Sequence, residues 1–448
     1  MVLPSRKEQV NRIDAAVSRE RSLSARPYPC RMDSALARPQ LGRWRTAVFA
    51  IFLASGLSIA TWAARVPDIK HAVGVDNARL GLMLLAGGIA SILGVSVSSI
   101  LLARFGARRG MLGAMILFGI GVALIGFGAS VFESPLVVTL GLLLWGFGNG
   151  AVDVMMNVEG AAIEKQSGKT ILPLFHAFFS FGTVIGAGLG VAAIAIGMKV
   201  VTHLSIIAVI IVVIACVSVA NVPARELNLD TPAAAPKLAL RERLHITLSA
   251  WREPRTYALG VILLGMAFAE GGANDWLALG IVEGHGADKA LGAAGLAVFS
   301  VSMTAVRVFG GPLVDRFGRV ATLRVLAATA TVGLLLFILA PTVPLIFVGA
   351  ALWGAGVSLG FPLGMSAAAD DPAKAAARVS ATATIGYIAF LAGPPLLGLI
   401  SEHIGLLNTL YILVALIIAS GLASPAARPI GGSTVGAGHP HRQSEHAG

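Results

Sequence analysis

Twelve separate apolar segments, each about 20 residues long, are the feature that most constrains how this chain of 448 residues can fold. A helix of that length spans the hydrocarbon core of a bilayer and satisfies its backbone hydrogen bonds within the segment. The segments lie at 45–64, 78–102, 110–130, 136–160, 172–195, 200–220, 257–281, 290–312, 321–340, 344–368, 378–400 and 404–423. The sequence therefore predicts an all-α integral membrane protein with twelve transmembrane helices.

The charge pattern supports a membrane protein and predicts its orientation. Only 13% of the residues are charged, whereas soluble domains carry about a quarter. The net charge of +11 does not indicate a nucleic-acid partner, because the basic residues gather in the tails and in alternate short loops. Basic loops mark the cytoplasmic side of a membrane, so this alternation predicts that both termini are cytoplasmic.

The longest polar interruption separates six apolar segments from six. The predicted organisation is a disordered basic tail, a six-helix bundle, a cytoplasmic linker, a second six-helix bundle and a disordered tail, at 1–43, 44–220, 221–256, 257–424 and 425–448. The two cysteines, Cys30 and Cys216, do not indicate disulfides or a thiolate metal site. Histidines in the last segment are expected to be solvated, so neither a metal nor a cofactor is expected.

Three matches in the same order indicate that the two bundles are copies of one another. Leu144–Gly148 resembles Leu352–Gly356, and Arg104-Phe105-Gly106 repeats as Arg316-Phe317-Gly318. Trp62 precedes a Gly-Leu pair by the same interval as Trp276 does in the second bundle. Parallel repeats of this kind place a substrate site near the middle of the membrane, at the interface between the halves.

The stretch from Gly311 to Arg319, GPLVDRFGR, resembles the loop signature of the major facilitator superfamily. The copy in the first half is degraded, with Ser99 and Ala103 in place of the glycine and the acid. The resemblance covers about residues 44–424 and implies two pseudo-symmetric bundles that move relative to one another. It also implies a cytoplasmic gate formed by Gly311, Asp315, Arg316, Gly318, Arg319, Arg104, Gly106 and Arg108.

Four further stretches resemble the bacterial group that includes the rhizopine-transport membrane protein and its inner-membrane relatives. These stretches are Trp62–Lys70, Asp153–Asn157, Phe175–Gly182 and Glu270–Trp276. Fucose-permease-like symporters are more distant relatives of the same pattern. The resemblance implies a protein of the bacterial inner membrane that acts as a monomer and moves a sugar-like or inositol-like solute.

One predicted helix carries an unusual polar face. Asn149, Asp153 and Asn157 are spaced four residues apart within an apolar segment, so a helix places them on one side. A carboxylate at membrane depth is costly, which favours a substrate or ion pathway at this face. The alternative is that these side chains hold two helices together.

By analogy with the superfamily, the first, fourth, seventh and tenth helices line a central cavity. Proton-coupling candidates are Asp153, Glu270 and His176, whose charge states are the most readily tuned by burial and by neighbours. Glu270 has the alternative role of pairing with Arg307, which was otherwise expected to extend toward the cytoplasm. The candidates for solute binding are Trp62, Asn149, Asn157, Asn274, Asp275 and Trp276. For Trp276 and Asp275, a position in an interfacial aromatic belt is the alternative.

The favoured interpretation is a secondary transporter that moves a small polar solute with protons by alternating access. An efflux antiporter for drugs or metabolites is the alternative. A membrane sensor is disfavoured because no sizeable soluble domain is present, and an enzyme because no nucleophile–base set or nucleotide loop is recognisable. The expected partners are therefore the solute, protons and the lipid bilayer.

Overall fold

The computed structural model describes residues 38–167, 171–223, 249–371 and 374–430, and residues 43–448 belong to one compact unit. Within the described ranges, twelve helices are long and apolar enough to cross a membrane, and no strand is present. The predicted all-α architecture with twelve spans is confirmed. Residues of the predicted tails and linker that lie outside the described ranges are 1–37, 224–248 and 431–448.

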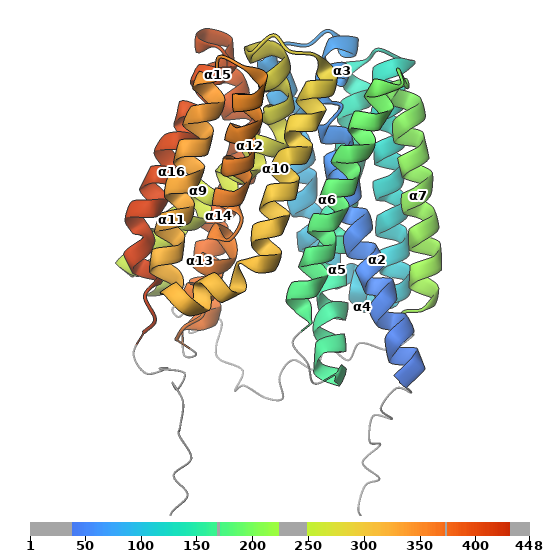
Figure 1. Ribbon diagram of the computed structural model, residues 1–448. Helices are drawn as coiled ribbons and strands as arrows, with labels where there is room; N and C mark the ends of the chain where they lie inside the picture. The colour runs from blue at the N-terminus through green and yellow to red at the C-terminus, as the bar shows by residue number, and fades with distance from the viewer. Residues whose placement is uncertain (1–37, 168–170, 224–248, 372–373, 431–448) are drawn as a thin grey trace, which may run out of the picture. The chain divides into compact units, whose positions relative to one another are not determined.

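The first six spans form the N-terminal half of the unit (Figure 1). Its helices are α2 (Arg38–Ala63), α3 (Val66–Val73), α4 (Asn77–Ser130), α5 (Pro135–Ser167), α6 (Leu172–Ala195) and α7 (Val200–Ala220). The long helix α4 holds the second and third spans, and α3 is a short helix that follows the first span. Helix α2 begins at Arg38, before the predicted boundary at residue 44.

The last six spans form the C-terminal half. Its elements are α9 (Pro254–Gly272), η1 (Ala273–Leu277), η2 (Gly280–Gly284), α10 (Lys289–Phe309), α11 (Gly311–Leu339), α12 (Val343–Val357), α13 (Gly360–Ala368), α14 (Ala375–Ile404), α15 (Leu406–Thr409), α16 (Tyr411–Ala423) and η3 (Ser424–Ala427). We call the end at which α2 begins and α16 ends the terminal end, and the end carrying α3 and α15 the loop end (Figure 1).

The internal repeat predicted from sequence is visible in the backbone. Within α4, Gly106 adopts φ 72° and ψ 171°, and within α11 Gly318 adopts φ 77° and ψ 163°. This region of conformational space is essentially restricted to glycine. Each glycine therefore turns the chain between two consecutive spans, at the same point of the Arg-Phe-Gly repeat in both halves.

Glycines on α5 let this helix approach its neighbour closely. A Cβ atom at Gly146 would lie 2.1 Å from the carbonyl oxygen of Gly87, and one at Gly150 would lie 2.1 Å from that of Ser91. No side chain fits at that distance, so only glycine permits this packing of α5 against α4. The packing fixes the rotation of α5 and hence the direction of its polar face.

Two spans of the C-terminal half depart from a simple helix. The tenth span breaks at Ser358 and Leu359, between α12 and α13. Pro362 has no amide hydrogen, so the carbonyl of Ser358, four residues earlier, lacks its helical donor. In the seventh span, the chain stays helical through Gly271 and Gly272 and widens into the π-helical segments η1 and η2.

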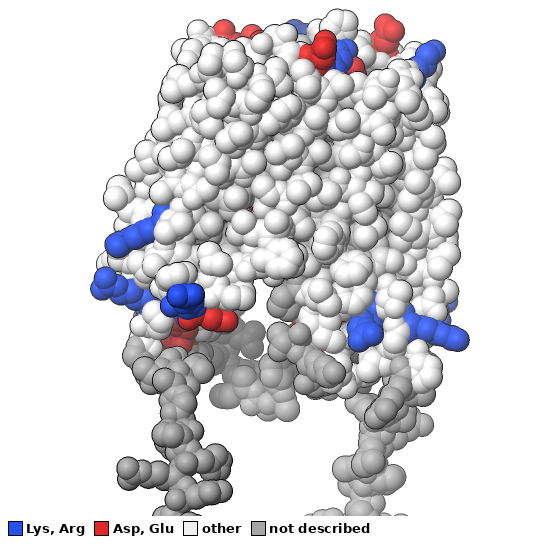
Figure 2. Space-filling model, in the orientation of Figure 1, with Lys and Arg blue, Asp and Glu red and all other residues white. Residues whose placement is uncertain are grey.

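The halves meet along two helix pairs, α4 with α14 and α6 with α10. At the second pair, Thr304 Oγ1 lies 3.3 Å from the carbonyl oxygen of Ser180. Figure 2 shows charged side chains toward both ends of the visible face and an uncharged band between them. It also shows the surface hollowed between the halves at the terminal end, which we call the terminal-end hollow.

Candidate functional site

The polar face of α5 presents Asp153 to the C-terminal half. The Asp153 side chain is exposed, although it lies within a membrane span, and it lies near Tyr387 of α14. Asn157 Nδ2 donates to the backbone carbonyl of Asp153 at 2.8 Å and lies 3.5 Å from its Oδ1. Within the described ranges, no Lys, Arg or His lies at ion-pair distance from Asp153.

The other members of this face are also accessible. Asn149 and Asn157 are half-buried, and the part of the chain that the structure describes offers no hydrogen-bond partner for the Asn149 side chain. The predicted alignment of Asn149, Asp153 and Asn157 on one helix is therefore present. Asp153 is exposed on this face and lies near Tyr387 of the other half, so α4 does not fully cover the face at that position.

The second candidate acid, Glu270 of α9, is paired with a cation. Arg307 of α10 places Nη2 2.9 Å from Glu270 Oε1 and 2.8 Å from Oε2. Arg307 Nε also donates to the Ser358 carbonyl at 3.0 Å, which is the oxygen that Pro362 leaves without a helical donor. Arg307 thus pairs with a half-buried acid and binds the carbonyl freed by the helix break, so the pairing given as the alternative role of Glu270 is present.

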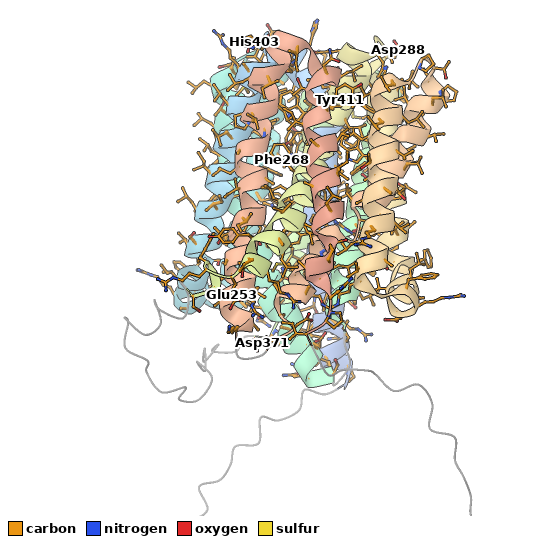
Figure 3. The ribbon with its side chains drawn as sticks, turned by 90° about the vertical axis from the view of Figure 1, so that its left-hand side faces the viewer. Glu253, Phe268, Asp288, Asp371, His403 and Tyr411 are labelled. Carbon is orange, nitrogen blue, oxygen red and sulfur yellow. The ribbon has the colours of Figure 1, made fainter. Side chains whose placement is uncertain are left out.

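The Glu270–Arg307 pair lies well inside the membrane span. Figure 3 places Phe268 between the two ends of the bundle, and Glu270 follows two residues later on α9. The side chains of Glu270 and Arg307 are 17% and 21% exposed. A charge pair at this depth and with this burial is neutralised internally, and it does not need a proton for charge balance.

His176 of α6 belongs with this pair and not with Asp153. Its ring is exposed, contacts Phe52 edge-on at a centroid distance of 5.3 Å, and is close enough to Arg307 for their charges to interact. No contact joins His176 to Asp153 or Asn157 in the described ranges.

The aromatic candidates are buried in this conformation. Trp276 is fully buried, and Trp62, 5% exposed, contacts Trp145 edge-on at 5.4 Å. Asn274 and Asp275, on the π-helical segment η1, are half-buried.

The arginines of the predicted gate motif contact other residues, whereas Gly311 and Asp315 of the same motif are exposed. Arg319 binds Asp370 at 2.7 Å, and Arg108 donates to the carbonyls of Ala220 (3.2 Å) and Val222 at the end of α7. Arg104 and Arg316 each lie over the ring of the next residue, at 5.8 and 5.4 Å. Gly311 and Asp315 are exposed, and no described residue forms a hydrogen bond or ion pair with Asp315.

The loop end, in contrast, is closed by contacts that cross between the halves. Lys289 Nζ lies 2.7 Å from Asp68 Oδ1, Lys70 Nζ lies 2.5 Å from Glu283 Oε1, and the Asn77 amide donates to Glu402 Oε1 at 2.6 Å. Arg65 joins this group through Asp68 at 3.3 Å and through the Met198 carbonyl at 2.6 Å. The protein is therefore closed at the loop end and hollowed at the terminal end.

Sequence reasoning missed a second buried acid. Glu159, which was not among the sequence candidates, is fully buried and accepts a hydrogen bond from Trp44 Nε1 at 2.8 Å. The sequence signal for Glu159 was an acid within the same apolar segment, two residues after Asn157. The sequence signal for the helix break at Ser358, whose carbonyl Arg307 binds, was Pro362 four residues later.

The chain resembles known membrane transporters along most of its length. The family model of the Major Facilitator Superfamily matches residues 47–394 and 276–436. An uncharacterized MFS-type transporter of Yersinia pestis is 30% identical over 84% of this chain and 93% of its own length. The membrane protein MosC of Rhizobium meliloti is 26% identical over 85% of this chain and 89% of its own length.

Solved structures show the same fold at low sequence identity. The nucleoside transporter NupG superposes with a TM-score of 0.68 and 14% identity, over 87% of this chain and 99% of that one. FucP in its outward conformation superposes with a TM-score of 0.61 and 17% identity, over 86% of this chain and 98% of that one.

Proposed function

This chain belongs to the Major Facilitator Superfamily, and from that premise we propose that it moves a small polar solute across the membrane together with protons, with Asp153 as the proton-carrying acid. The family and the fold support membrane transport. The solute class and the coupling are inferred from the residues that line the space between the halves.

The observation that carries the proposal is the difference between the two candidate acids. Glu270 has Arg307 at ion-pair distance, whereas Asp153 is exposed between the halves without a cation among the described residues. A carboxylate without a cation at membrane depth is costly when ionised, so it favours binding a proton before the site is closed to water. Asp153 is therefore the acid whose protonation would change the energy of the conformational transition.

A polar, hydroxyl-bearing solute fits the side chains near Asp153. Asn149 and Asn157 offer amide donors and acceptors on the same face, and Asn274 offers another from the opposite half. FucP is a fucose:proton symporter and NupG is a nucleoside transporter, and both names describe hydroxyl-bearing ring compounds as solutes. A sugar-like or inositol-like solute is the class we propose for this chain.

The arrangement of the two ends supports alternating access. The ion pairs Asp68–Lys289 and Lys70–Glu283 hold the halves together at the loop end, while the terminal end is hollowed. With both termini cytoplasmic, as the loop charges predict, this conformation admits solute from the cytoplasmic side. Transport then requires these loop-end ion pairs to separate while the terminal end closes.

The test is transport in proteoliposomes that contain the purified full-length protein. Solutes that raise its thermal stability would be selected from a panel of fucose, myo-inositol and nucleosides, and used in labelled form. Asp153→Asn should abolish accumulation driven by a pH gradient, yet retain exchange of labelled for unlabelled solute, because exchange requires no net proton transfer.

Glu270→Gln is the matched acid-to-amide control, and it should keep the pH dependence of the parent. If Asp153→Asn accumulates solute with the parent pH dependence, Asp153 is not the coupling acid. If protons move in the direction opposite to the solute, the protein is an antiporter and not a symporter.

A further inference from the structure

A groove on the outer surface of the C-terminal half is separate from the solute site. It has a volume of about 450 Å³ and runs along the seam between α11 and α16. Figure 1 shows these two helices side by side at the edge of the C-terminal half that faces away from the N-terminal half. The groove therefore opens toward lipid and not toward the space between the halves.

The groove exists because small residues line a helix seam at regular spacing. Ala327 and Ala328 lie on the groove side of α11, and Gly421 lies opposite on α16. Their short side chains leave a channel whose walls are completed by apolar neighbours such as Leu422, which is 77% exposed. Apart from one arginine the lining carries no charge, so the groove suits a hydrocarbon chain better than a water-soluble solute.

The arginine at one end of the groove supplies a charge. Arg324 Nε is 3.1 Å from the hydroxyl of Ser424, which holds the guanidinium in place. The side chain is exposed, and among the described residues no acid lies at ion-pair distance from it. Arg324 follows the turn at Gly318 by six residues, or about 9 Å along a helix, which places it near the membrane interface at the terminal end.

We propose that this groove binds an anionic phospholipid, with one acyl chain along the α11–α16 seam and the phosphate on Arg324. A fixed guanidinium with unpaired Nη donors is well suited to a phosphate group. Anionic lipids are enriched in the cytoplasmic leaflet, which is the predicted side of the terminal end. The lipid would brace α11 against α16, the two helices that carry the groove.

The proposal is tested with the purified full-length protein in detergent, by native mass spectrometry and by thermal unfolding. The probes are phosphatidylglycerol, phosphatidylcholine with the same acyl chains, and inorganic phosphate. The parent protein should retain phosphatidylglycerol about fivefold better than phosphatidylcholine, the preference expected for one interfacial Arg. Phosphate alone should not raise the unfolding temperature, because the acyl chain contributes much of the binding.

Two variants separate the charge from the groove. Arg324→Gln should lose the preference for phosphatidylglycerol, while Arg109→Gln, an exposed arginine of the N-terminal half, should keep it. Ala328→Trp should weaken retention of both lipids, because the larger ring fills the exposed side of the groove; Ala328→Leu is the milder version if the first fails to fold.

Three outcomes would overturn the proposal. One is an equal lipid preference in the Arg324→Gln variant and the parent protein. Another is a stabilisation that phosphate reproduces without lipid. The third is a mass spectrum in which the seam is occupied by a second copy of the chain, seen as a dimer that Ala328→Trp dissociates.

Discussion

The two halves share the same glycine turn between two consecutive spans, which we call the joint. They differ in the helix that should carry the solute site. Gly106 and Gly318 turn the chain in the same conformation in both halves. In the N-terminal half the fourth span, α5, is continuous and carries Asp153 on an accessible polar face. In the C-terminal half the corresponding tenth span is broken at Ser358, and the carbonyl freed by the break is bound by Arg307.

This difference teaches how a duplicated bundle becomes asymmetric. The joint is governed by backbone conformation, which only glycine satisfies, so both copies are equally constrained there. The site is governed by side chains, and the acid within a membrane span has different neighbours in the two halves. One acid is paired with a cation, whereas the other has none among the described residues and is the acid that we propose to bind a proton.

The largest expected effect comes from breaking the pair in the C-terminal half. Arg307→Gln leaves Glu270 without its cation, and losing one partner of a buried pair costs about 3 kcal/mol. The double variant Glu270→Gln/Arg307→Gln should recover most of this loss. Asp153→Asn removes an acid that has no cation among the described residues, so it should not lower the midpoint of thermal unfolding. Thermal unfolding of the purified variants measures all three, and a stable Arg307→Gln single variant would remove the proposed contrast between the acids.

A smaller effect is expected at the shared joint. Alanine at Gly106 or Gly318 must adopt a positive φ, which costs about 1–3 kcal/mol, and the two costs should be similar if the joints are equivalent. Gly113→Ala is the control, because a Cβ there meets nothing within 4 Å and the helix favours alanine over glycine. Unequal losses of thermal stability at the two joints would show that the halves differ there too.

The smallest expected effect concerns the terminal end of the C-terminal half, where Figure 3 labels Glu253. Hydrogen bonds from Arg378 and Lys374, at 2.6 and 2.8 Å, lower the pKa of Glu253 below its usual 4.5. A lowered pKa in the folded state means that the stabilisation is present above the unfolded value and is lost as the pH falls through the folded one. Glu253→Gln should therefore cost about 1 kcal/mol at neutral pH, as expected for an ion pair at the protein surface that is only partly exposed.

The pH dependence distinguishes this ion pair from a purely structural contact. The difference in unfolding midpoint between Glu253→Gln and the parent should shrink as the pH is lowered below 4.5. Asp315→Asn, an exposed acid for which the described residues provide no partner, should behave like the parent throughout. A constant difference between Glu253→Gln and the parent at every pH would mean that the charge of Glu253 contributes nothing.

Much of the fold could be predicted because its causes are local. The spans follow from the length of apolar runs, and the repeated joint follows from Arg-Phe-Gly occurring twice. Asp153 could be identified as a candidate site residue for the same reason, because a charged residue within an apolar segment is recognised without knowing its neighbours in space. The π-helical continuation of α9 was not predicted, because two adjacent glycines permit several backbone conformations and packing selects among them.

By itself, the sequence determined that this chain spans a membrane twelve times in two related halves, and that one span carries an acidic polar face. Only the tertiary structure decided which acid has a cation, because Glu270 and Arg307 are 37 residues apart and their side chains meet only in the folded C-terminal half, beside the break at Ser358. It also decided that the loop end is closed and the terminal end hollowed. The membrane spans follow from the hydropathy of residues that are adjacent in the chain. Ion pairs and the closure of the loop end depend on residues that are distant in the chain and become neighbours only on folding.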